Sequence, residues 1–269
     1  MIQYDYAMPL SSIKLSWMKE KPDQYLFFDI ETTGLSAARS DLYLIGYGTI
    51  INNEQFRITL LFNDDGCSEP KILAAFREVL FHYKYLVTYN GDTFDLPYIK
   101  EKCRQFRQEI SFDSITSIDV YRKIRKYKKS LQMDSMKQSA LESAMGMKRD
   151  EFHSGGLLID AYYDYLNTKD THLLDMLLSH NKDDIYGLFF VSGVLTLTSF
   201  FDGEFEISET SCTDTHFMIR VQTGMLAIPF DTICNDIHIS GKDKTVLIEI
   251  PVIRDTLKYF YKDYKNYFY

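Results

Sequence analysis

The order of apolar and polar positions predicts a sheet near the start of the chain. Residues 25–30 are a short apolar run that ends at Thr32-Thr33-Gly34, which is typical of a buried strand closed by a turn. Residues 43–51 and 56–62 flank the polar segment 52–54, and this arrangement predicts a hairpin. We therefore expect three antiparallel strands at the beginning of the domain.

Helical and strand-like patterns then alternate. Ser68 can cap a helix in which apolar residues recur every three or four positions as far as Tyr83. Further patterns predict strands over 85–89 and 117–121 and helices over 97–106, 135–145, 157–167 and 171–198. Five strands with intervening helices indicate an α/β fold, a mixed five-stranded sheet flanked by helices.

The helix predicted over 171–198 overlaps an uncharged stretch, residues 185–201, whose length is near the lower limit for a membrane span. This stretch contains several Gly, Ser and Thr residues and follows a charged helical pattern. We interpret it as a buried core helix and expect no membrane association.

The pattern changes again from about residue 201. Short strands are predicted at 204–209, 215–221, 225–229 and 245–250, with turns at Thr223-Gly224 and at Ser240-Gly241-Lys242. We therefore expect an N-terminal extension over 1–24, an α/β domain over 25–199 and a small β-rich C-terminal unit over 200–269.

Aromatic side chains crowd the last eleven residues, 259–269. Exposing so many aromatic side chains to water is energetically unfavourable. The segment either docks on the domain or on a protein partner, or the chain ends short of its natural terminus.

Composition narrows the class of protein. Apolar residues make up 45% and charged residues 25%, which excludes a disordered or low-complexity chain. The net charge of −8 argues against a protein that coats nucleic acid through bulk positive charge. The four cysteines are scattered without a zinc-binding spacing, and the first twenty residues contain no signal-peptide pattern. The expected compartment is the cytoplasm.

Two acidic residues stand at the end of the first apolar strand. Strand alternation places Asp29 and Glu31 on one face and Phe28 and Ile30 on the other. Carboxylates side by side beside a core repel each other unless one is protonated or a cation neutralises both. Mg²⁺ or Mn²⁺ would do so through oxygen ligands. The alternative is an exposed strand end that has no special chemistry.

A third carboxylate, Asp95, lies just after a predicted strand and before the helix that begins near Pro97. Its position suits a site at the end of the sheet. Taken alone, Asp95 is first interpreted as a helix N-cap, because Pro favours the first turn of a helix.

A histidine and a fourth carboxylate share one stripe of the long predicted helix. His180 and Asp184 recur at helical spacing with Leu173, Leu177 and Leu188, so both are expected to face the core. A buried imidazole beside a buried carboxylate requires a metal or a hydrogen-bond network.

These motifs together resemble a known family. Residues 28–35, then Tyr89-Asn90-Gly91 leading to Phe94-Asp95, then 180–184, resemble the three exonuclease motifs of the DnaQ-like (DEDD) superfamily of 3′→5′ exonucleases. Within it the sequence most resembles the bacterial YprB-type group of ribonuclease H-like proteins, over roughly residues 25–195.

The resemblance implies a ribonuclease H-like fold in which two Mg²⁺ or Mn²⁺ ions cut a phosphodiester bond. By position, Asp29 would bridge both ions, Glu31 and Asp184 would complete one site, and Asp95 would act directly or through water. His180 would be the general base. Histidine-type members usually leave four residues between the histidine and the aspartate, whereas this chain leaves three, the spacing of the tyrosine-type members.

The resemblance also implies a substrate site for a single-stranded end of DNA or RNA. The residues that would border the terminal nucleotide are Thr32, Thr33, Gly34, Leu35, Asn90 and Phe94.

A basic run offers a further contact to nucleic acid. Arg122, Lys123, Arg125 and Lys126, followed by two more lysines, are interleaved with tyrosines, which suits phosphate contacts and base stacking. A solvated surface is an equal alternative. Nearby Asp119 is expected to hold a turn or cap a helix.

The sequence leaves three functions open. The first is a metal-dependent 3′→5′ exonuclease. The second is a weak or inactive nucleic-acid-binding or scaffold protein on the same fold, and the third is an endonuclease that uses the same acids.

Overall fold

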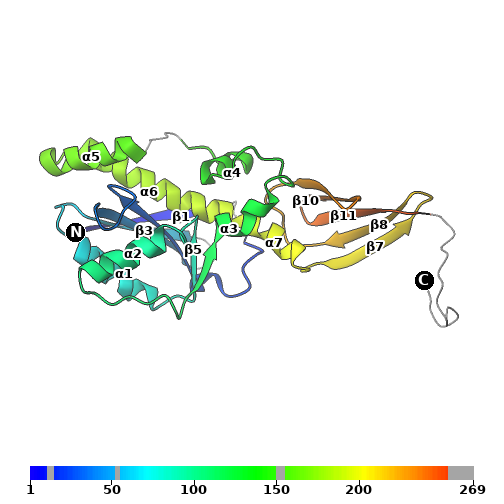
Figure 1. The fold of residues 1–269 in the computed structure, drawn as a ribbon, viewed down its shortest axis with the longest axis horizontal. Coiled ribbons are helices and arrows are strands. Elements are labelled where there is room, and N and C mark those ends of the chain that lie inside the picture. The colour runs from blue at the N-terminus through cyan, green and yellow to red at the C-terminus, as the bar shows by residue number, and fades with distance from the viewer. Residues whose placement is uncertain (11–14, 52–54, 150–154, 254–269) are drawn as a thin grey trace.

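The computed structural model describes residues 1–10, 15–51, 55–149 and 155–253. Within these ranges the chain forms two sheets (Figure 1). The larger is a mixed six-stranded sheet in the order β1-β4-β3-β2-β5-β6, and the smaller is an antiparallel five-stranded sheet in the order β7-β8-β11-β10-β9. The smaller sheet projects to one side of the larger domain, beyond α7 (Figure 1).

The larger sheet consists of β1 (Ile2–Pro9), β2 (Tyr25–Thr32), β3 (Leu42–Ile51), β4 (Gln55–Phe62), β5 (Tyr85–Thr88) and β6 (Thr116–Asp119). Its helices are α1 (Glu69–Leu80), α2 (Asp95–Gln105), α3 (Val120–Ile124), α4 (Gln138–Ala144), α5 (Gly155–Thr168), α6 (Thr171–Val191) and α7 (Leu195–Phe201). The smaller sheet consists of β7 (Glu206–Cys212), β8 (His216–Gln222), β9 (Phe230–Cys234), β10 (Ile237–Lys242) and β11 (Thr245–Pro251).

Strand β2 lies inside the larger sheet and divides the core into two layers. It pairs antiparallel with β3 and parallel with β5. Leu26, Phe28 and Ile30 point into a cluster with α1 and α2, whereas Tyr25 and Phe27 point into the opposite cluster with α6. This is the alternation expected of a strand buried on both faces. Helices therefore cover both sides of the sheet.

The α/β fold with a mixed sheet, flanking helices and a small β-rich C-terminal unit is as the sequence predicts, but the larger sheet has six strands and not five. Residues 2–9, assigned to an N-terminal extension, form the edge strand β1 paired antiparallel with β4. The sequence signal there is weak because β1 is an edge strand whose side chains are all exposed or only half-buried. The predicted hairpin turn at 52–54 lies outside the described residues, while the strands on either side pair as expected.

The C-terminal sheet corrects two predictions. Residues 225–229 are not a strand, and the next strand, β9, begins at Phe230. Ser240-Gly241-Lys242 is not a turn but part of β10. Gly241 is required there because a Cβ atom on it would lie 2.2 Å from Cε1 of Phe230. A glycine inside a strand often marks such a close approach, and in a sequence it resembles a turn.

The smaller sheet contacts the larger domain at its Phe230 end. The ring of Phe230 packs against Phe200 and Phe201 at centroid distances of 5.7 and 5.6 Å. The amide of Asp231 donates a hydrogen bond to the carbonyl of Ser130. The aromatic segment 259–269 lies outside the described residues.

Among the described residues, one helical run, Thr171–Phe201, is long and apolar enough to cross a membrane by length and composition. Within its most apolar window, 67% is buried inside the protein. The run packs on the larger sheet (Figure 1), as expected of a core helix, and such helices pass the same test of length and composition.

Close packing of α6 on the sheet depends on a glycine in β3. Gly46 pairs with Asp29 across β2 and β3, and a Cβ atom on Gly46 would lie 1.8 Å from Oδ1 of Asn181 on α6. Asn181 is fully buried at this contact. Strand β3 can therefore approach α6 this closely only because position 46 has no side chain.

We predict that Gly46→Ala destabilises the protein by about 1–3 kcal/mol, because the added methyl group overpacks the contact with α6. The free energy of unfolding from denaturant titration measures the change. Gly156→Ala is the matched control: Gly156 is exposed in α5 with nothing near its Cβ position, so the substitution should be neutral or stabilising by up to about 1 kcal/mol. Equal effects at the two positions would contradict the packing argument.

Candidate active site

The end of β2 carries two carboxylates to the face covered by α6. Asp29 and Glu31 continue the side of the strand that Tyr25 and Phe27 present to this helix. Tyr43 donates a hydrogen bond of 3.4 Å to Oε2 of Glu31. Burial, together with the negative charge of Asp184, raises the pKa of Glu31 to about 8.

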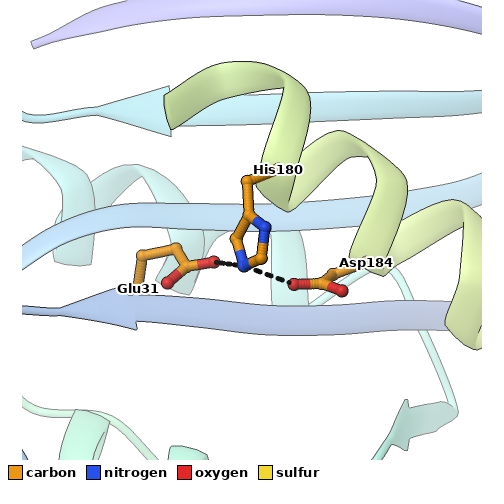
Figure 2. A group of neighbouring side chains, drawn as sticks. All are labelled: Glu31, His180 and Asp184. Carbon is orange, nitrogen blue, oxygen red and sulfur yellow. Dashed lines mark ion pairs between the residues drawn. The ribbon is translucent and has the colours of Figure 1, made fainter. Parts of the chain in front are cut away.

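Helix α6 places an imidazole between two carboxylates (Figure 2). Nε2 of His180 lies 3.1 Å from Oδ2 of Asp184 and 3.6 Å from Oε1 of Glu31. The side chains of Glu31 and His180 are 15% and 16% exposed, so the group opens to solvent while remaining largely enclosed. One ligand atom from each of the three residues falls within 4.8 Å of the others. Two predicted carboxylates and the predicted histidine therefore converge.

Asp29 lies beside this group but is not one of the three residues whose ligand atoms converge within 4.8 Å. Oδ2 of Asp29 accepts a hydrogen bond of 2.8 Å from Nδ2 of Asn181. Loss of hydration and the negative charges of its acidic neighbours Asp95, Asp184 and Glu31 raise the pKa of Asp29 well above its usual range. The negative charges of Asp95 and Asp184 therefore act on Asp29 as they do on Glu31.

Asn181 is a site residue that the sequence analysis does not assign. It is fully buried, and its Oδ1 atom has no hydrogen-bond partner among the described residues. Its amide fills the space that Gly46 leaves in front of Asp29. A sequence signal exists, because Asn181 lies three residues before Asp184 and so shares its helix face. Asparagine is, however, common on solvated helix surfaces.

Asp95 is buried at the start of α2 and faces β2. Its Oδ1 accepts a hydrogen bond of 3.2 Å from the amide of Ile30, between the two strand carboxylates. Burial raises the pKa of Asp95 to about 7. The alternative N-cap role is wrong, because Phe94 is the N-cap and α2 begins at Asp95 itself.

Arg149 is a second site residue that the sequence analysis does not assign. Its Nη1 atom lies 2.6 Å from Oδ1 of Asp184, and its other guanidinium nitrogens contact Glu142 of α4. The guanidinium lowers the pKa of Asp29, against the effect of the surrounding acids. No sequence pattern indicates this contact, because Arg149 lies outside any helix or strand.

The turn after β2 follows the strand end that carries Glu31. Thr32 donates a hydrogen bond to the carbonyl of Gly34, and the hydroxyl of Thr33 accepts one from the amide of Asp41. Leu35 at the tip is 88% exposed. The turn thus holds an apolar side chain out in solvent.

The loop after β5 contains Asn90, which has a left-handed φ of 65°. Asp119 accepts hydrogen bonds from the amides of Asn90 and Asp92 and also caps α3 through the amide of Arg122. The role expected of Asp119, holding a turn and capping a helix, is confirmed. Phe94, farther along the loop, is half-buried with its ring 5.5 Å from that of Tyr98.

The residues of the basic run have different surroundings. Arg125, Lys126 and Lys128 line a cavity of about 970 Å³ together with Asn90 and other residues including Tyr89 and Tyr121. Arg122 forms an ion pair with Asp92, and Lys123 lines a separate cavity of about 150 Å³. Only part of the run is therefore brought beside Asn90.

The donor set fits divalent cations. Asp29, Glu31, Asp95 and Asp184 bring four carboxylates to one region, and His180 adds an imidazole nitrogen. Hard divalent cations bind carboxylate oxygens, and Mn²⁺ also accepts an imidazole. Among the described residues, the guanidinium of Arg149 contacts this set at Asp184, and Glu142 shares its charge. Divalent cations would supply further positive charge to the set.

Comparison with known proteins assigns the family. Residues 26–196, more than half of the chain, match the sequence profile of the RNase_H superfamily. The chain belongs to the RNase_H superfamily. The ribonuclease H-like fold that the sequence predicts is thereby confirmed, as is the resemblance to the YprB-type group.

The chain is also similar to a curated bacterial protein and to solved structures. "Uncharacterized protein YprB" of Bacillus subtilis (strain 168) is 28% identical over 171 residues, which are 60% of this chain and 39% of that protein. The chain thus spans about two fifths of that relative's length. Among solved structures, the family B DNA polymerase of Pyrobaculum calidifontis matches with a TM-score of 0.53 and 17% identity, over 65% of this chain and 25% of the polymerase. That likeness shows the fold alone.

A second solved structure is more distant. E. coli exonuclease I in complex with a dA16 oligonucleotide matches with a TM-score of 0.36 and 17% identity, over 58% of this chain and 43% of that chain. A score of this size does not establish a shared arrangement of the site.

We predict that the stability of the cation-free protein contains a component that falls as pH rises. The ordinary pKa of Glu31 is 4.5 and its folded value is about 8, so the folded state binds more protons across this range. Each such group then lowers the free energy of unfolding by at most about 1.4 kcal/mol per pH unit. Denaturant titrations from pH 5 to 8 with a chelator measure the slope.

Glu31→Gln isolates this component. The difference in stability between the variant and the parent protein should grow in the variant's favour as pH rises, and saturating Mn²⁺ should reduce the dependence. A difference that is constant with pH would show that Glu31 ionises normally.

Proposed function

We propose that the chain is a divalent-cation-dependent nuclease that hydrolyses phosphodiester bonds, as a 3′→5′ exonuclease on single-stranded ends. The observation that carries this proposal is the convergence of Glu31, His180 and Asp184 within 4.8 Å, with Asp29 and Asp95 beside them. Membership of the RNase_H superfamily supports the choice of reaction. The polarity and the preference for single strands rest on the resemblance of the three motifs.

The carboxylates would hold the cations. Asp29, Glu31 and Asp184 are the proposed ligands, and Asp95 would act directly or through water. Bound Mg²⁺ or Mn²⁺ ions supply Lewis-acid chemistry that activates a water molecule and stabilises the leaving oxygen. Asn181 fixes the orientation of Asp29 through its amide hydrogen bond.

His180 is the proposed general base. Asp184 and Glu31 orient its ring at Nε2 in the cation-free protein (Figure 2). Once these carboxylates bind cations, a neutral imidazole can accept a proton from the attacking water. Its slight exposure, 16%, leaves room for a proton to leave to solvent.

The cavity beside Asn90 is the proposed path of the nucleic acid strand. It presents Arg125, Lys126 and Lys128 for phosphates and Tyr89 and Tyr121 for bases. The two tyrosine rings lie 5.9 Å apart at their centroids. Arg122 and Lys123 are outside this lining, so the proposed contact set is narrower than the whole basic run. The exposed Leu35 and the Asn90 loop would border the terminal nucleotide.

A second function, binding without catalysis, is favoured by one observation. Arg149 neutralises part of the charge of Asp184 without any cation, as it would in a protein that retains the fold but does not cut. A scaffold of this kind would use the C-terminal unit to recruit a protein partner.

We predict Mn²⁺- or Mg²⁺-dependent shortening of end-labelled single-stranded DNA or RNA by the purified full chain. Glu31→Gln should abolish turnover by removing a cation ligand. His180→Ala should lower turnover by about 10²–10⁴-fold, the usual contribution of a general base, while Mn²⁺ binding by calorimetry is retained. A nested product ladder from the 3′ end supports an exonuclease.

Circular single strands serve as the control substrate. Cutting of circles would assign an endonuclease. Binding of nucleic acid without turnover in either metal would instead support the scaffold function.

We also predict that Arg125→Gln/Lys126→Gln weakens binding to single strands of every sequence and flattens its salt dependence. The slope of log K against log salt should fall by roughly 0.7 for each phosphate that the protein no longer neutralises. Lys123→Gln/Lys129→Gln removes the same charge from residues outside the cavity lining and is the matched control. Equal weakening in both variants would assign the effect to net charge and reject the proposed path.

A further inference from the structure

The contact between Arg149 and Asp184 is built by several elements. Nε and Nη2 of Arg149 donate hydrogen bonds of 2.6 Å to the two oxygens of Glu142, while Nη1 lies 2.6 Å from Oδ1 of Asp184. The side chains of Arg149 and Glu142 are 10% and 2% exposed. The guanidinium of Arg149 thus bridges two carboxylates: one edge binds Glu142 of α4, and the remaining nitrogen contacts Asp184 of α6.

Glu142 is fixed in turn. Nε2 of Gln138 donates a hydrogen bond of 2.9 Å to Oε1 of Glu142 and another of 2.9 Å to the carbonyl of Asp184. Glu142 also packs on α6 at Gly187, where a Cβ atom would lie 1.9 Å from Oε1. The amide of Gln138 and the space at Gly187 thus fix the carboxylate of Glu142. Glu142 in turn holds Arg149 beside Asp184.

Both oxygens of Asp184 have a nitrogen partner in this arrangement. Oδ1 contacts Arg149, and Oδ2 lies 3.1 Å from Nε2 of His180. A cation that binds Asp184 must therefore share one of these oxygens or replace a partner. A guanidinium at ion-pair distance also repels a divalent cation in the same region.

We propose that Arg149 is a positioning residue that acts as a resident counter-cation of Asp184 and sets the affinity of the site for divalent cations. In the cation-free protein it offsets the repulsion among the buried carboxylates, and cation binding must release or weaken its contact with Asp184. This inference rests on the proposed metal centre.

The test uses a pair of substitutions that conserves net charge. Glu142→Gln/Arg149→Gln removes both members of the α4 ion pair, so no buried charge is left unpaired between them. Glu142→Gln alone is the matched control, because it leaves Arg149 charged and beside Asp184. The probe is Mn²⁺ alone, titrated calorimetrically into the full chain after chelation, without substrate.

We predict that the double variant binds Mn²⁺ at least about tenfold more tightly than the parent protein, a difference of about 1.4 kcal/mol, and that Glu142→Gln alone binds no more tightly than the parent. The double variant should also unfold at a lower temperature without cation and show a larger rise in that temperature with Mn²⁺. If the ion pair is purely structural, the double variant should unfold at a lower temperature than the parent by the same amount with and without Mn²⁺. Its affinity for Mn²⁺ should then equal that of the parent.

A second measurement needs no folded double variant. In the parent protein the guanidinium ¹⁵N–¹H signals of Arg149, assigned by their loss in Arg149→Lys, should shift when Mg²⁺ is added. Unchanged signals at saturating Mg²⁺, or equal Mn²⁺ affinities in the parent and the double variant, would overturn the role of Arg149 while leaving the metal centre intact. Absence of Mn²⁺ binding in every variant would overturn both the metal centre and this inference.

Discussion

Repulsion among carboxylates buried between a sheet and a helix is the constraint around which this domain is arranged. Asp29, Glu31 and Asp95 lose hydration on burial, and the negative charge of Asp184 adds to the repulsion at Asp29 and Glu31. Such a group is stable only if protons, hydrogen-bond donors or cations compensate it. The structure supplies all three kinds in part: raised carboxyl pKa values, the amide of Asn181, and the guanidinium of Arg149.

The packing around the acids follows from the same constraint. Helix α6 must approach β2 and β3 closely for Asn181 to reach Asp29, and Gly46 in β3 makes this approach sterically feasible. On the other side of α6, Gly187 admits the carboxylate of Glu142. Two glycines in regular elements, where they are otherwise unfavourable, thus accommodate the polar groups that stabilise the site.

Local periodicity was sufficient to predict the parts of the site that lie within one element. Alternation along residues 25–31 and the stripe that contains His180 and Asp184 are properties of a single strand and a single helix, so the facing side chains follow from spacing alone. The family motifs then joined the elements. Asn181 was missed because an amide carries no strong pattern, and Arg149 because its position depends on the path of an irregular segment.

Contacts between strands explain two further differences between prediction and structure. The sequence does not predict β1, because an edge strand needs few apolar residues. It predicts a turn at Gly241, because the ring that covers this glycine comes from a neighbouring strand. Pairing across the sheet decides both, and neighbouring sequence does not report it.

The first strand of the smaller sheet, β7, has a consequence for solution behaviour. Within the described part of the chain it pairs with β8 on one side and is the outermost strand of its sheet, and all of its residues are exposed. An unpaired strand edge is a template on which a second chain can add. The register shift between Ile207 and Glu209 and the charges of Glu206 and Glu209 oppose such addition. Self-association through this edge should therefore be weak, although the strand edge itself is open.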